Sequence, residues 1–413
     1  MSSSSLSLSA SRRQFFILVL VAGFLISMVG FGPRSALGLF LPPMSAANGW
    51  GREVFSLALA IQILVWGAAQ PFAGALADRF GIARVLSVGA ILYAIGLALM
   101  AYSTTPLMLN LSAGFIAGFG VAGSSFTLVL AAFGKLLPQE WRSPAFGLGT
   151  AAGSFGQFLF SPLVIGLIDG FGWRNTLLIF GGVVLLIIPL SLALIAPKAH
   201  TEAEPSPAEK QSLFQALSEA FGHRSYVLLV LGFFTCGFQL LFITVHLPAY
   251  LVDRGLSADA GAWTIGVIGL FNIVGSILAG WLGDRMPKRY LLSIIYFARS
   301  LAVAAFITMP PSFTSAVVFG AVIGLLWLST VPPTNGLVAL MFGTRWLATL
   351  FGFAFFSHQV GGFLGVWLGG VLFELYGSYN VIWWGSIILG VASAIINLPI
   401  VEKPVPRAAP AAA

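Results

Sequence analysis

GALADRFGIAR, residues 74–84, lies between two long apolar runs, and a second version of it, GWLGDRMPKR, occupies residues 280–289. The two copies start 206 residues apart in a chain of 413. A shorter pair extends the match, because DGFGWRN at 169–175 resembles ELYGSYN at 374–380, 205 residues further on. Repetition at half the chain length predicts two similar halves. Halves of similar hydropathy are typical of secondary transporters that are built from repeats.

Each copy predicts a charged turn between two membrane helices. Asp78 ends one apolar run, Arg79 begins the turn, and Gly81 allows a backbone conformation that other residues resist. The pattern Gly-x-Leu-x-Asp-Arg-x-Gly-x-x-Arg resembles the loop signature of the major facilitator superfamily. This resemblance implies a cytoplasmic loop that latches neighbouring helices in the outward-open state. We therefore expect a gating role for Asp78, Arg79, Asp284 and Arg285; a merely solvated charged turn is the alternative.

The composition places the chain in a lipid bilayer. Hydrophobic residues make up 58% of it and charged residues 8%, and the mean hydropathy is +0.97. A soluble domain carries roughly a quarter of charged residues. The single cysteine, Cys236, excludes a disulfide framework and a multi-cysteine metal site. We expect no metal and no cofactor.

The apolar runs predict an all-α membrane protein with twelve transmembrane helices in two six-helix halves, which is the major facilitator fold. A helix needs about 20 apolar residues to cross a bilayer. The first run begins near Gln14 and continues to about Leu41, and eleven more follow near 54–77, 85–103, 107–133, 143–168, 174–196, 226–252, 260–282, 290–310, 314–341, 346–374 and 380–400. The expected division is a disordered cytoplasmic terminus (1–13), a first half (14–196), a cytoplasmic linker with an amphipathic helix (197–225), a second half (226–400) and a cytoplasmic tail (401–413).

The basic residues predict the orientation, because Lys and Arg concentrate in cytoplasmic loops. With both termini inside, three arginines face outward and fifteen basic residues lie on the cytoplasmic side. The outer ones are Arg52, Arg174 and Arg254; the inner ones are Arg12, Arg13, Arg79, Arg84, Lys135, Arg142, Lys198, Lys210, Arg224, Arg285, Lys288, Arg289, Arg345, Lys403 and Arg407. The net charge of +7 is therefore spread over many short loops, which excludes a nucleic-acid surface. We expect a multi-pass protein of the bacterial cytoplasmic (inner) membrane.

Four ionisable side chains fall within the predicted spans: Arg34, Arg299, His246 and His358. The 13 acidic residues all fall at span ends or in loops. A charge at the bilayer centre costs at least about 3 kcal/mol, and such residues usually face a cavity and mark a pathway. Because no acid shares their depth, the hypothesis is that the substrate supplies the anion, and a guanidinium has the planar fork that fits a carboxylate.

Each of the four has a structural alternative. Arg34 lies in the outer third of its span and could instead extend to the headgroups. Arg299 could bond the carbonyls of a neighbouring helix. His358 could carry a coupled proton or contact an anion, or it could simply join two helices, and the same holds for His246. Gln239, Asn272 and Asn335 are equally compatible with substrate contact and with helix packing.

Within the superfamily the chain resembles the monocarboxylate transporters and their oxalate:formate antiporter relatives. Pro33-Arg34-Ser35 matches a first-helix Pro-Lys-Ser, and Phe133-Gly134-Lys135 through Arg142, Ala145, Gly147, Ala151 and Gly153 resembles the signature that leads into span five. His358 occupies the span-eleven position where relatives have Glu or Lys. The eighth helix of these transporters carries Asp-x-x-x-Arg, where this chain has Asn272 and Ser276.

The leading interpretation is symport of a small organic monocarboxylate with a proton, and a monomer is expected. Carboxylate exchange, which needs no titrating group, is the main alternative. Efflux of amphiphilic drugs is a third reading, favoured by 36 phenylalanines and disfavoured by the buried cations. An enzyme is not expected, because the sequence shows no nucleophile–base pair, metal cluster or phosphate loop.

Overall fold

The computed structural model describes residues 10–195, 212–343 and 346–405 and contains, in those ranges, helices without strands. Eleven described segments are long and apolar enough to cross a membrane. One of them, Ala145–Leu194, is 50 residues long and turns at Gly172, so it holds two spans and the total is twelve. Gly172 has φ 76°, which suits a residue without a Cβ atom. The predicted all-α, twelve-helix fold is confirmed.

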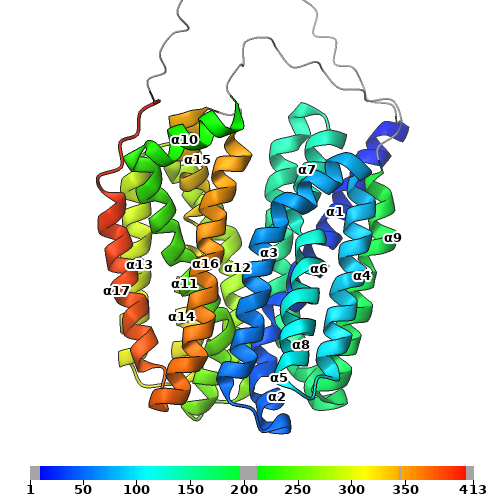
Figure 1. The fold of residues 1–413 in the computed structure, drawn as a ribbon, viewed down its shortest axis with the longest axis vertical. Helices are drawn as coiled ribbons and strands as arrows, with labels where there is room; N and C mark the ends of the chain where they lie inside the picture. Colours follow the sequence, from blue (N-terminus) through cyan, green and yellow to red (C-terminus); the bar gives the residue numbers. More distant parts are fainter. Residues whose placement is uncertain (1–9, 196–211, 344–345, 406–413) are drawn as a thin grey trace, which may run out of the picture.

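Six spans form the first half of the bundle, which Figure 1 shows in blue to green. The elements are α1 (Ala10–Ser35), η1 (Leu37–Phe40), α2 (Leu41–Asn48), α3 (Arg52–Phe80), α4 (Ile82–Ala101), α5 (Pro106–Leu109), η2 (Asn110–Ile116), α6 (Ala117–Gly123), α7 (Phe126–Leu136), α8 (Gln139–Leu185), α9 (Ile187–Ser191) and η3 (Leu192–Leu194). The helix of the first span begins at Ala10, four residues before the apolar run near Gln14. The expectations for residues 1–9 and 406–413 lie outside the described residues.

The second half has the same number of spans. Its elements are α10 (Leu213–Gly222), α11 (Arg224–Asp253), α12 (Ala258–Gly283), α13 (Lys288–Thr308), α14 (Phe313–Leu326), α15 (Val331–Phe342), α16 (Leu347–Tyr376) and α17 (Asn380–Asn397). α10 lies within residues 197–225, the range given above for the linker. Ser212 and Gln215 cap its start reciprocally, and Phe214 is 80% exposed.

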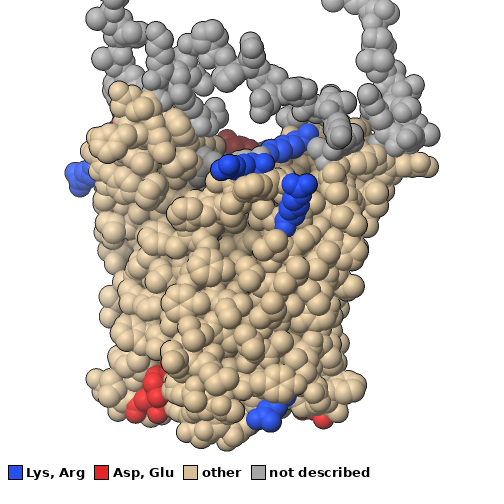
Figure 2. Space-filling view, turned by 45° about the vertical axis from the view of Figure 1, so that its right-hand side comes forward, with Lys and Arg blue, Asp and Glu red and all other residues tan. Residues whose placement is uncertain are grey.

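Charged side chains mark the two ends of the bundle. We call the end with α10 and α15 the linker end, and the end with α2 and α5 the Arg52 end (Figure 1). On the face shown in Figure 2, blue and red side chains gather near these ends, and the belt between them is almost wholly uncharged. Such a belt is what a protein needs in order to sit in hydrocarbon.

The two halves meet along two pairs of helices, α3 with α16 and α8 with α12. One apolar cluster is built mainly from the first half, and a second lies within the second half. Five residues of the second half also join the first cluster: Leu241, Val245, Ala249, Ala262 and Val366. Small residues allow close contact between the halves: a Cβ atom on Gly38 of η1 would lie 2.8 Å from the Cα atom of Val245 in α11. Residues on these facing helices can therefore be shared by both halves.

Candidate functional site

Arg34 occupies the last turn of α1, where Pro33 and the following 3-10 turn η1 interrupt the first span. Its side chain is 7% exposed and lies over the ring of Trp66 in α3, with 4.4 Å between the guanidinium carbon and the ring centroid. This is a cation–π contact inside the bundle. The side chain therefore turns inward, and the alternative of extension to the headgroups does not describe its position.

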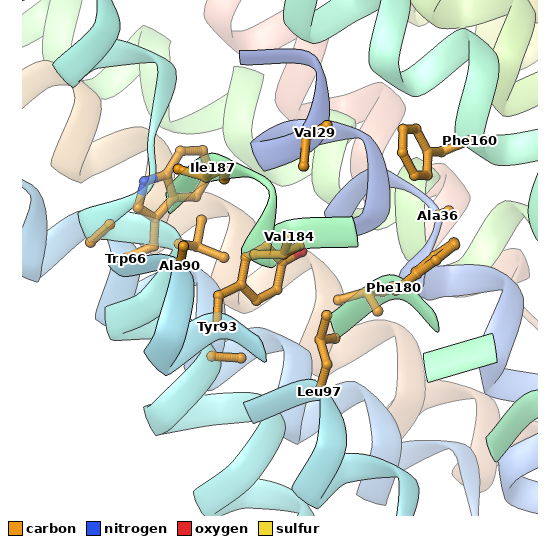
Figure 3. Packing of buried hydrophobic residues seen from close by; sticks show 14 of the residues in the cluster. Val29, Ala36, Trp66, Ala90, Tyr93, Leu97, Phe160, Phe180, Val184 and Ile187 are labelled. Atoms are coloured by element: carbon orange, nitrogen blue, oxygen red, sulfur yellow. The ribbon is translucent and has the colours of Figure 1, made fainter. Parts of the chain in front are cut away.

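Arg34 lacks a hydrogen-bond acceptor for its Nε among the described residues. That atom is buried without a partner, and so is the hydroxyl of Tyr93 from α4, which is near enough to interact electrostatically with the guanidinium. Figure 3 shows Trp66 and Tyr93 among the apolar side chains Ala90, Val184 and Ile187. Two donors in an apolar setting without acceptors favour a site for an anionic oxygen.

A row of aromatic contacts leads from Arg34 into the second half. The ring of Trp66 meets Phe355 of α16 edge to face at 5.7 Å, and Phe355 stacks on His358 at 5.7 Å with planes 7° apart. His358 Nδ1 lies 3.0 Å from Gln359 Oε1, and Gln359 Nε2 donates to the carbonyl of Ile63 at 3.1 Å. The structure thus places Arg34 and His358, two residues selected from the sequence, on one path across the interface between the halves.

Arg299 has a structural role in this conformation. It is 1% exposed, and its Nε and Nη2 donate to the carbonyl of Leu326 at 2.9 and 2.5 Å. Nη2 also donates to the carbonyl of Trp327. These carbonyls end α14, where they have no partner inside the helix. The geometry therefore agrees with the structural alternative for Arg299, in which its guanidinium bonds the carbonyls of a neighbouring helix. Of its three nitrogens, only Nη1 lacks a partner.

Span ten is broken just before Pro332-Pro333, a pair of prolines that by itself indicates a helix break. Pro332 and Pro333 are the second and third residues of α15, and the chain leaves the helix over residues 327–330. Proline fits the first turn of a helix because it needs no N–H donor there. The freed carbonyls of α14 are used by Arg299. Asn335 is half-buried in α15, and its Oδ1 has no hydrogen-bond partner.

Asn272 and Gln239 join helices. Asn272 Nδ2 donates to Ser154 Oγ of α8 at 2.8 Å, and its Oδ1 accepts from the backbone N–H of Leu328 at 3.0 Å. Gln239 Nε2 donates to the carbonyl of Ser386 at 2.9 Å, while its Oε1 is buried without a partner. Asn272 is fully engaged in packing here, whereas Gln239 keeps one free acceptor.

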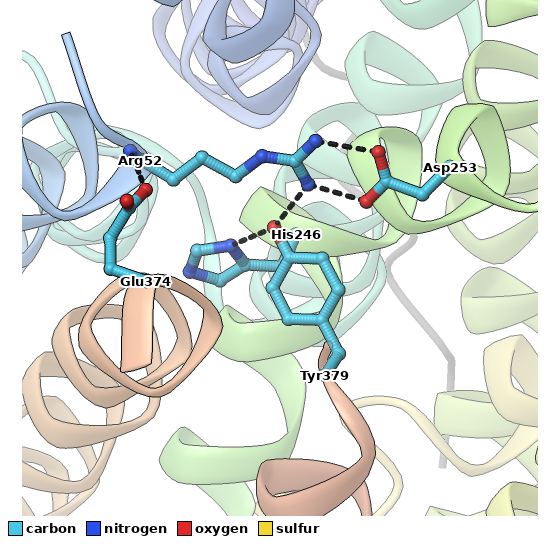
Figure 4. Close-up of polar contacts among 5 residues, drawn as sticks. All are labelled: Arg52, His246, Asp253, Glu374 and Tyr379. Carbon is cyan, nitrogen blue, oxygen red and sulfur yellow. Dashed lines mark hydrogen bonds and ion pairs between the residues drawn. The ribbon is translucent and has the colours of Figure 1, made fainter. Parts of the chain in front are cut away.

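His246 belongs to a polar network at the Arg52 end (Figure 4). Its Nδ1 lies 3.1 Å from the Tyr379 hydroxyl, and its Nε2 lies 2.8 Å from the carbonyl of Val366. Gly237, which packs on the backbone of His358, precedes His246 by nine residues of the same helix, or about 13.5 Å of rise. His246 is thus well separated from His358 and is not part of the Arg34 path.

Arg52 is the centre of that network. Its guanidinium makes two 2.6 Å bonds to the carboxylate of Asp253 and donates to the Tyr379 hydroxyl at 2.9 Å. Its backbone N–H donates to Glu374 at 2.6 Å, as Figure 4 shows. We call Arg52, His246, Asp253, Glu374 and Tyr379 the Arg52 lock. It fastens α3 of the first half to α11, α16 and α17 of the second.

The charged turns lie at the other end of the bundle. Arg79 is exposed against Phe80, and Arg285 lies 3.9 Å over the ring of Trp281 and donates to its carbonyl at 3.2 Å. Asp284 is exposed. The side chain of Asp78 lies outside the described part of the chain. Each of these arginine contacts lies within one half of the molecule.

Sequence reasoning missed Trp66, Tyr93, Phe355 and every member of the Arg52 lock except His246. Trp66 and Tyr93 carry polar atoms at mid-span, which is a usable signal for a buried polar site. The other members of the Arg52 lock had no such signal, since they lie as far apart as 327 residues. Within the described residues, three or more His, Cys, Asp or Glu side chains nowhere gather as a metal site would need.

The fold and this interface define a multi-pass membrane transporter of two six-helix halves, rather than an enzyme. The family model of the Major Facilitator Superfamily matches residues 19–366. The chain belongs to that superfamily.

Several relatives cover nearly the full chain. An uncharacterised MFS-type transporter of Bacillus subtilis, YcxA, is 27% identical over 402 residues and spans 96% of this chain and 97% of its own length. Monocarboxylate transporter 13 of Rattus norvegicus is 27% identical and covers 92% of this chain and 88% of its own. Monocarboxylate transporter 11 of Homo sapiens is also 27% identical, with coverages of 92% and 82%.

Solved transporters share the fold. A bacterial homologue of the human lysosomal transporter Spinster, in an inward-facing and unoccupied conformation, matches with a TM-score of 0.72 at 17% identity, over 95% of this chain and 96% of its own. A D-xylose–proton symporter matches with a TM-score of 0.67 at 18% identity, over 94% and 97%.

Proposed function

We propose that the protein carries a small organic monocarboxylate across the membrane by alternating access, in symport with a proton. The observation that carries this proposal is the state of Arg34, a buried guanidinium that stacks on Trp66 and whose Nε has no acceptor among the described residues. A carboxylate accepts two parallel N–H bonds from such a group. The similarity to monocarboxylate transporters 11 and 13 supports the same substrate class.

Proton coupling is assigned to His358. It lies on the path from Arg34 through Trp66 and Phe355, so its charge state can respond to an anion bound there. His246 is the less suitable carrier, because it is held by Tyr379 and Val366 within the Arg52 lock. Gln at position 358 keeps hydrogen-bonding capacity but cannot titrate. H358Q should lose accumulation driven by a pH gradient and retain exchange.

The orientation that we propose puts both termini and the linker end in the cytoplasm. In the described parts of the chain, most basic residues lie at the helix ends of the linker end, which agrees with the rule that Lys and Arg concentrate in cytoplasmic loops. The Arg52 end then faces outward, and a bacterial inner membrane is the proposed location. A cysteine introduced at position 205 should react only with reagent added from the cytoplasmic side; reaction from outside would reverse this orientation.

Carboxylate exchange is the second candidate. The specific observation in its favour is that Asn272 and Ser276 replace the Asp-x-x-x-Arg of the resembled family, and Asn272 is engaged with Ser154 and Leu328. A carrier without a deep carboxylate can exchange anions without moving protons. If H358Q and H246Q both accumulate substrate normally in a pH gradient, exchange or another proton path replaces symport by these histidines.

The decisive experiment is binding of small carboxylates to R34Q. We expect affinity to fall by about tenfold or more, because a hydrogen bond to a charged group contributes roughly 1.5–3 kcal/mol. R34K should recover only part, since it keeps the charge but loses the fork. Ligand-induced thermal shifts of the purified protein provide the measurement.

Arg174→Gln is the matched control, because Arg174 also stacks on a tryptophan, at 5.1 Å, but is exposed. It should bind carboxylates as the wild type does. A neutral analogue of the same shape should bind weakly to every variant. Unchanged carboxylate affinity in R34Q would remove the residue on which the proposed substrate class depends.

A further inference from the structure

A series of hydrogen bonds leads from Trp66 to the place where the fourth span of the first half is broken. Trp66 Nε1 donates to Gln70 Oε1 at 2.9 Å, one turn further along α3. Gln70 Nε2 lies 3.0 Å from Ser125 Oγ and 2.6 Å from Thr127 Oγ1, and these two hydroxyls are 2.7 Å apart. Ser125 immediately precedes α7, so the series ends between α6 and α7. The proposed function uses Trp66 and gives no role to the other three residues.

The chemistry of the indole fixes the orientation of the Gln70 amide. An indole N–H can only donate, so the atom of Gln70 that faces Trp66 is the carbonyl oxygen Oε1. The amide nitrogen then faces Ser125 and Thr127 and has one N–H for each hydroxyl. If the two ends of the amide were exchanged, its NH₂ group would face the indole N–H. The half-buried Gln70 therefore has one orientation that satisfies all its partners.

The ring that Gln70 holds is the one on which Arg34 lies. Trp66 is 5% exposed, and its ring centroid is 4.4 Å from the guanidinium carbon of Arg34. A cation is attracted to the face of an aromatic ring and not to its edge. The torsion that turns an indole about its Cβ–Cγ bond is broad by itself. The hydrogen bond at Nε1 restricts this torsion, and so it determines which way the face of Trp66 points.

The second half has a related arrangement that lacks the aromatic ring. Asn272 and Ser276 follow Trp66 and Gln70 by 206 residues, which is the offset of the repeat. Ser276 Oγ donates to Asn272 Oδ1 at 3.1 Å, and the same oxygen accepts from the N–H of Leu328 at the break in span ten. A polar pair one turn apart thus ties the second helix of each half to the break in its fourth. In the first half this pair includes a ring that lies against a cation, so its hydrogen bonds bear on a charged site as well as on packing.

We propose that Gln70 is a positioning residue for the anion site, where it holds the face of Trp66 toward Arg34. The held ring stabilises the buried guanidinium on one side and leaves its Nε, which has no acceptor among the described residues, available to a carboxylate. Gln70 acts through Trp66 and does not touch the substrate. The effect on carboxylate affinity rests on the proposed function, whereas the orientation of the ring does not.

The indole N–H of Trp66 reports the orientation of the ring in the empty protein. Nitrogen-15 labelling of tryptophan gives one indole NMR signal for each of the 11 tryptophans, and the signal that is missing in W66F belongs to Trp66. We expect this N–H to exchange with deuterium severalfold faster in Q70L than in the wild type, because it has lost its acceptor. Exchange in Q70L that is as slow as in the wild type would overturn the proposal.

Q62L is the matched control, because Gln62 lies one turn before Trp66 on α3, as Gln70 lies one turn after it. Gln62 Nε2 donates to the carbonyl of Ala113 in η2 at 2.8 Å, so it also joins α3 to the fourth span, but without a hydrogen bond to the indole. Q62L should lower the melting temperature and leave both the exchange of the Trp66 N–H and carboxylate affinity at the wild-type level. The comparison therefore separates positioning of the ring from a general loss of stability.

Carboxylate affinity tests what the held ring does for the site. Q70L should bind small carboxylates about two- to tenfold more weakly than the wild type, a factor that corresponds to one neutral hydrogen bond. W66F should also lose affinity, and W66F/Q70L should bind as W66F does, because Gln70 acts only through the indole. Losses that add in the double variant would refute the positioning role.

R34Q distinguishes failure of this inference from failure of the proposed function. If R34Q loses carboxylate affinity while Q70L binds as the wild type does, the positioning role is wrong and the proposed function stands. If R34Q binds carboxylates with unchanged affinity, the proposed function fails. The exchange rate of the Trp66 N–H in Q70L then still decides whether Gln70 holds the ring.

Discussion

Arg34 and Tyr93 bring two unpaired polar groups into the apolar interior of the first half. A buried donor or acceptor without a partner costs about 1–3 kcal/mol. Such a cost is recovered when a ligand supplies the missing acceptor, which is how a binding site can discriminate against ligands that lack it. The pair therefore makes the empty protein less stable than the loaded one, and substrates should raise its thermal stability.

Tyr93→Phe isolates the smaller of the two contributions. The variant keeps the buried ring and loses only the hydroxyl. We expect carboxylate affinity to fall by about two- to tenfold, because a neutral hydrogen bond contributes about 0.5–1.5 kcal/mol. The stability of the empty protein should stay the same or rise, since an unpaired hydroxyl is removed. Thermal shifts with and without carboxylate measure both quantities.

Tyr102→Phe is the control for this substitution, because Tyr102 ends the same helix but is 60% exposed. It should change neither quantity. If Y93F binds as tightly as the wild type, Tyr93 does not contact the anion, and Arg34 acts without it.

Arg299→Gln should weaken the fold rather than binding at Arg34. Glutamine cannot reach both carbonyls at the end of α14, and each lost bond to a charged donor costs about 1.5–3 kcal/mol. We expect a clear fall in the melting temperature with nearly unchanged carboxylate affinity. Arg285→Gln, an exposed arginine that bonds one carbonyl of its own helix, should melt as the wild type does. A large loss of affinity in R299Q without a loss of stability would return Arg299 to the substrate site.

Sequence reasoning selected Arg34, Arg299 and His358 because charge at bilayer depth is rare and visible. It could not say which of them has partners, since a partner is defined by packing. Arg299 finds its carbonyls 27 and 28 residues away on another helix. Tyr93 and Cys236 look like ordinary apolar-helix residues until their neighbours are known. The charge pattern therefore predicts where polar sites lie, but the contacts decide what each can do.

The fourth helix of each half is broken at equivalent positions. In the first half α6 ends at Gly123 and α7 begins at Phe126; in the second half α14 ends at Leu326 and α15 begins at Val331. The two breaks correspond, because Ser124 and Thr330 are separated by the repeat offset of 206 residues. Hydropathy alone predicts continuous spans over 107–133 and 314–341, because it does not register a break that side chains and neighbouring helices satisfy. Only the second break has a sequence signal, the pair Pro332-Pro333.

The Arg52 lock should hold the Arg52 ends of α3, α11, α16 and α17 together. A bidentate, partly exposed ion pair contributes up to about 1 kcal/mol. Loss of this pair in R52Q should let the Arg52 end open severalfold more often, and each opening should expose Ser56, which is buried beside Arg52. A cysteine at position 56 provides the measurement, as its labelling rate by a soluble thiol reagent should rise in the R52Q background. Cys236 is fully buried and supplies the background rate in the protein without the new cysteine.

Arg254→Gln is the matched control for the lock. Arg254 lies next to Asp253 but makes a weak contact over the ring of Tyr250, at 5.9 Å. Labelling at position 56 should stay at the wild-type rate in R254Q. An unchanged rate in R52Q as well would mean that apolar packing, rather than the ion pair, closes this end.

The whole molecule is closed at the Arg52 end and splayed at the linker end. A Cβ atom on Gly67 of α3 would lie 2.7 Å from Gln359 Cγ of α16, but one on Gly74, two turns on, would have nothing within 4 Å. The helices α8 and α12 show the same difference between the two ends. A Cβ atom on Gly269 would lie 2.6 Å from the carbonyl oxygen of Ser154, whereas a Cβ atom on Gly280 would have nothing within 4 Å. The repeat in the sequence predicts the two halves, but their relative tilt depends on contacts between them.

Rocking of the halves would bring the linker ends of α8 and α12 together as the Arg52 lock opens. Gly147 lies two turns from Ser154 along α8, toward the linker end, and Gly280 lies three turns from Gly269 along α12, in the same direction. A Cβ atom at Gly147 or at Gly280 would have nothing within 4 Å. We therefore expect G147C/G280C to form a disulfide slowly in the wild type and faster with R52Q. The crosslink should stop transport, and a reductant should restore it. A pair that never crosslinks, or a crosslinked protein that still transports, would contradict rocking of the halves about their shared interface.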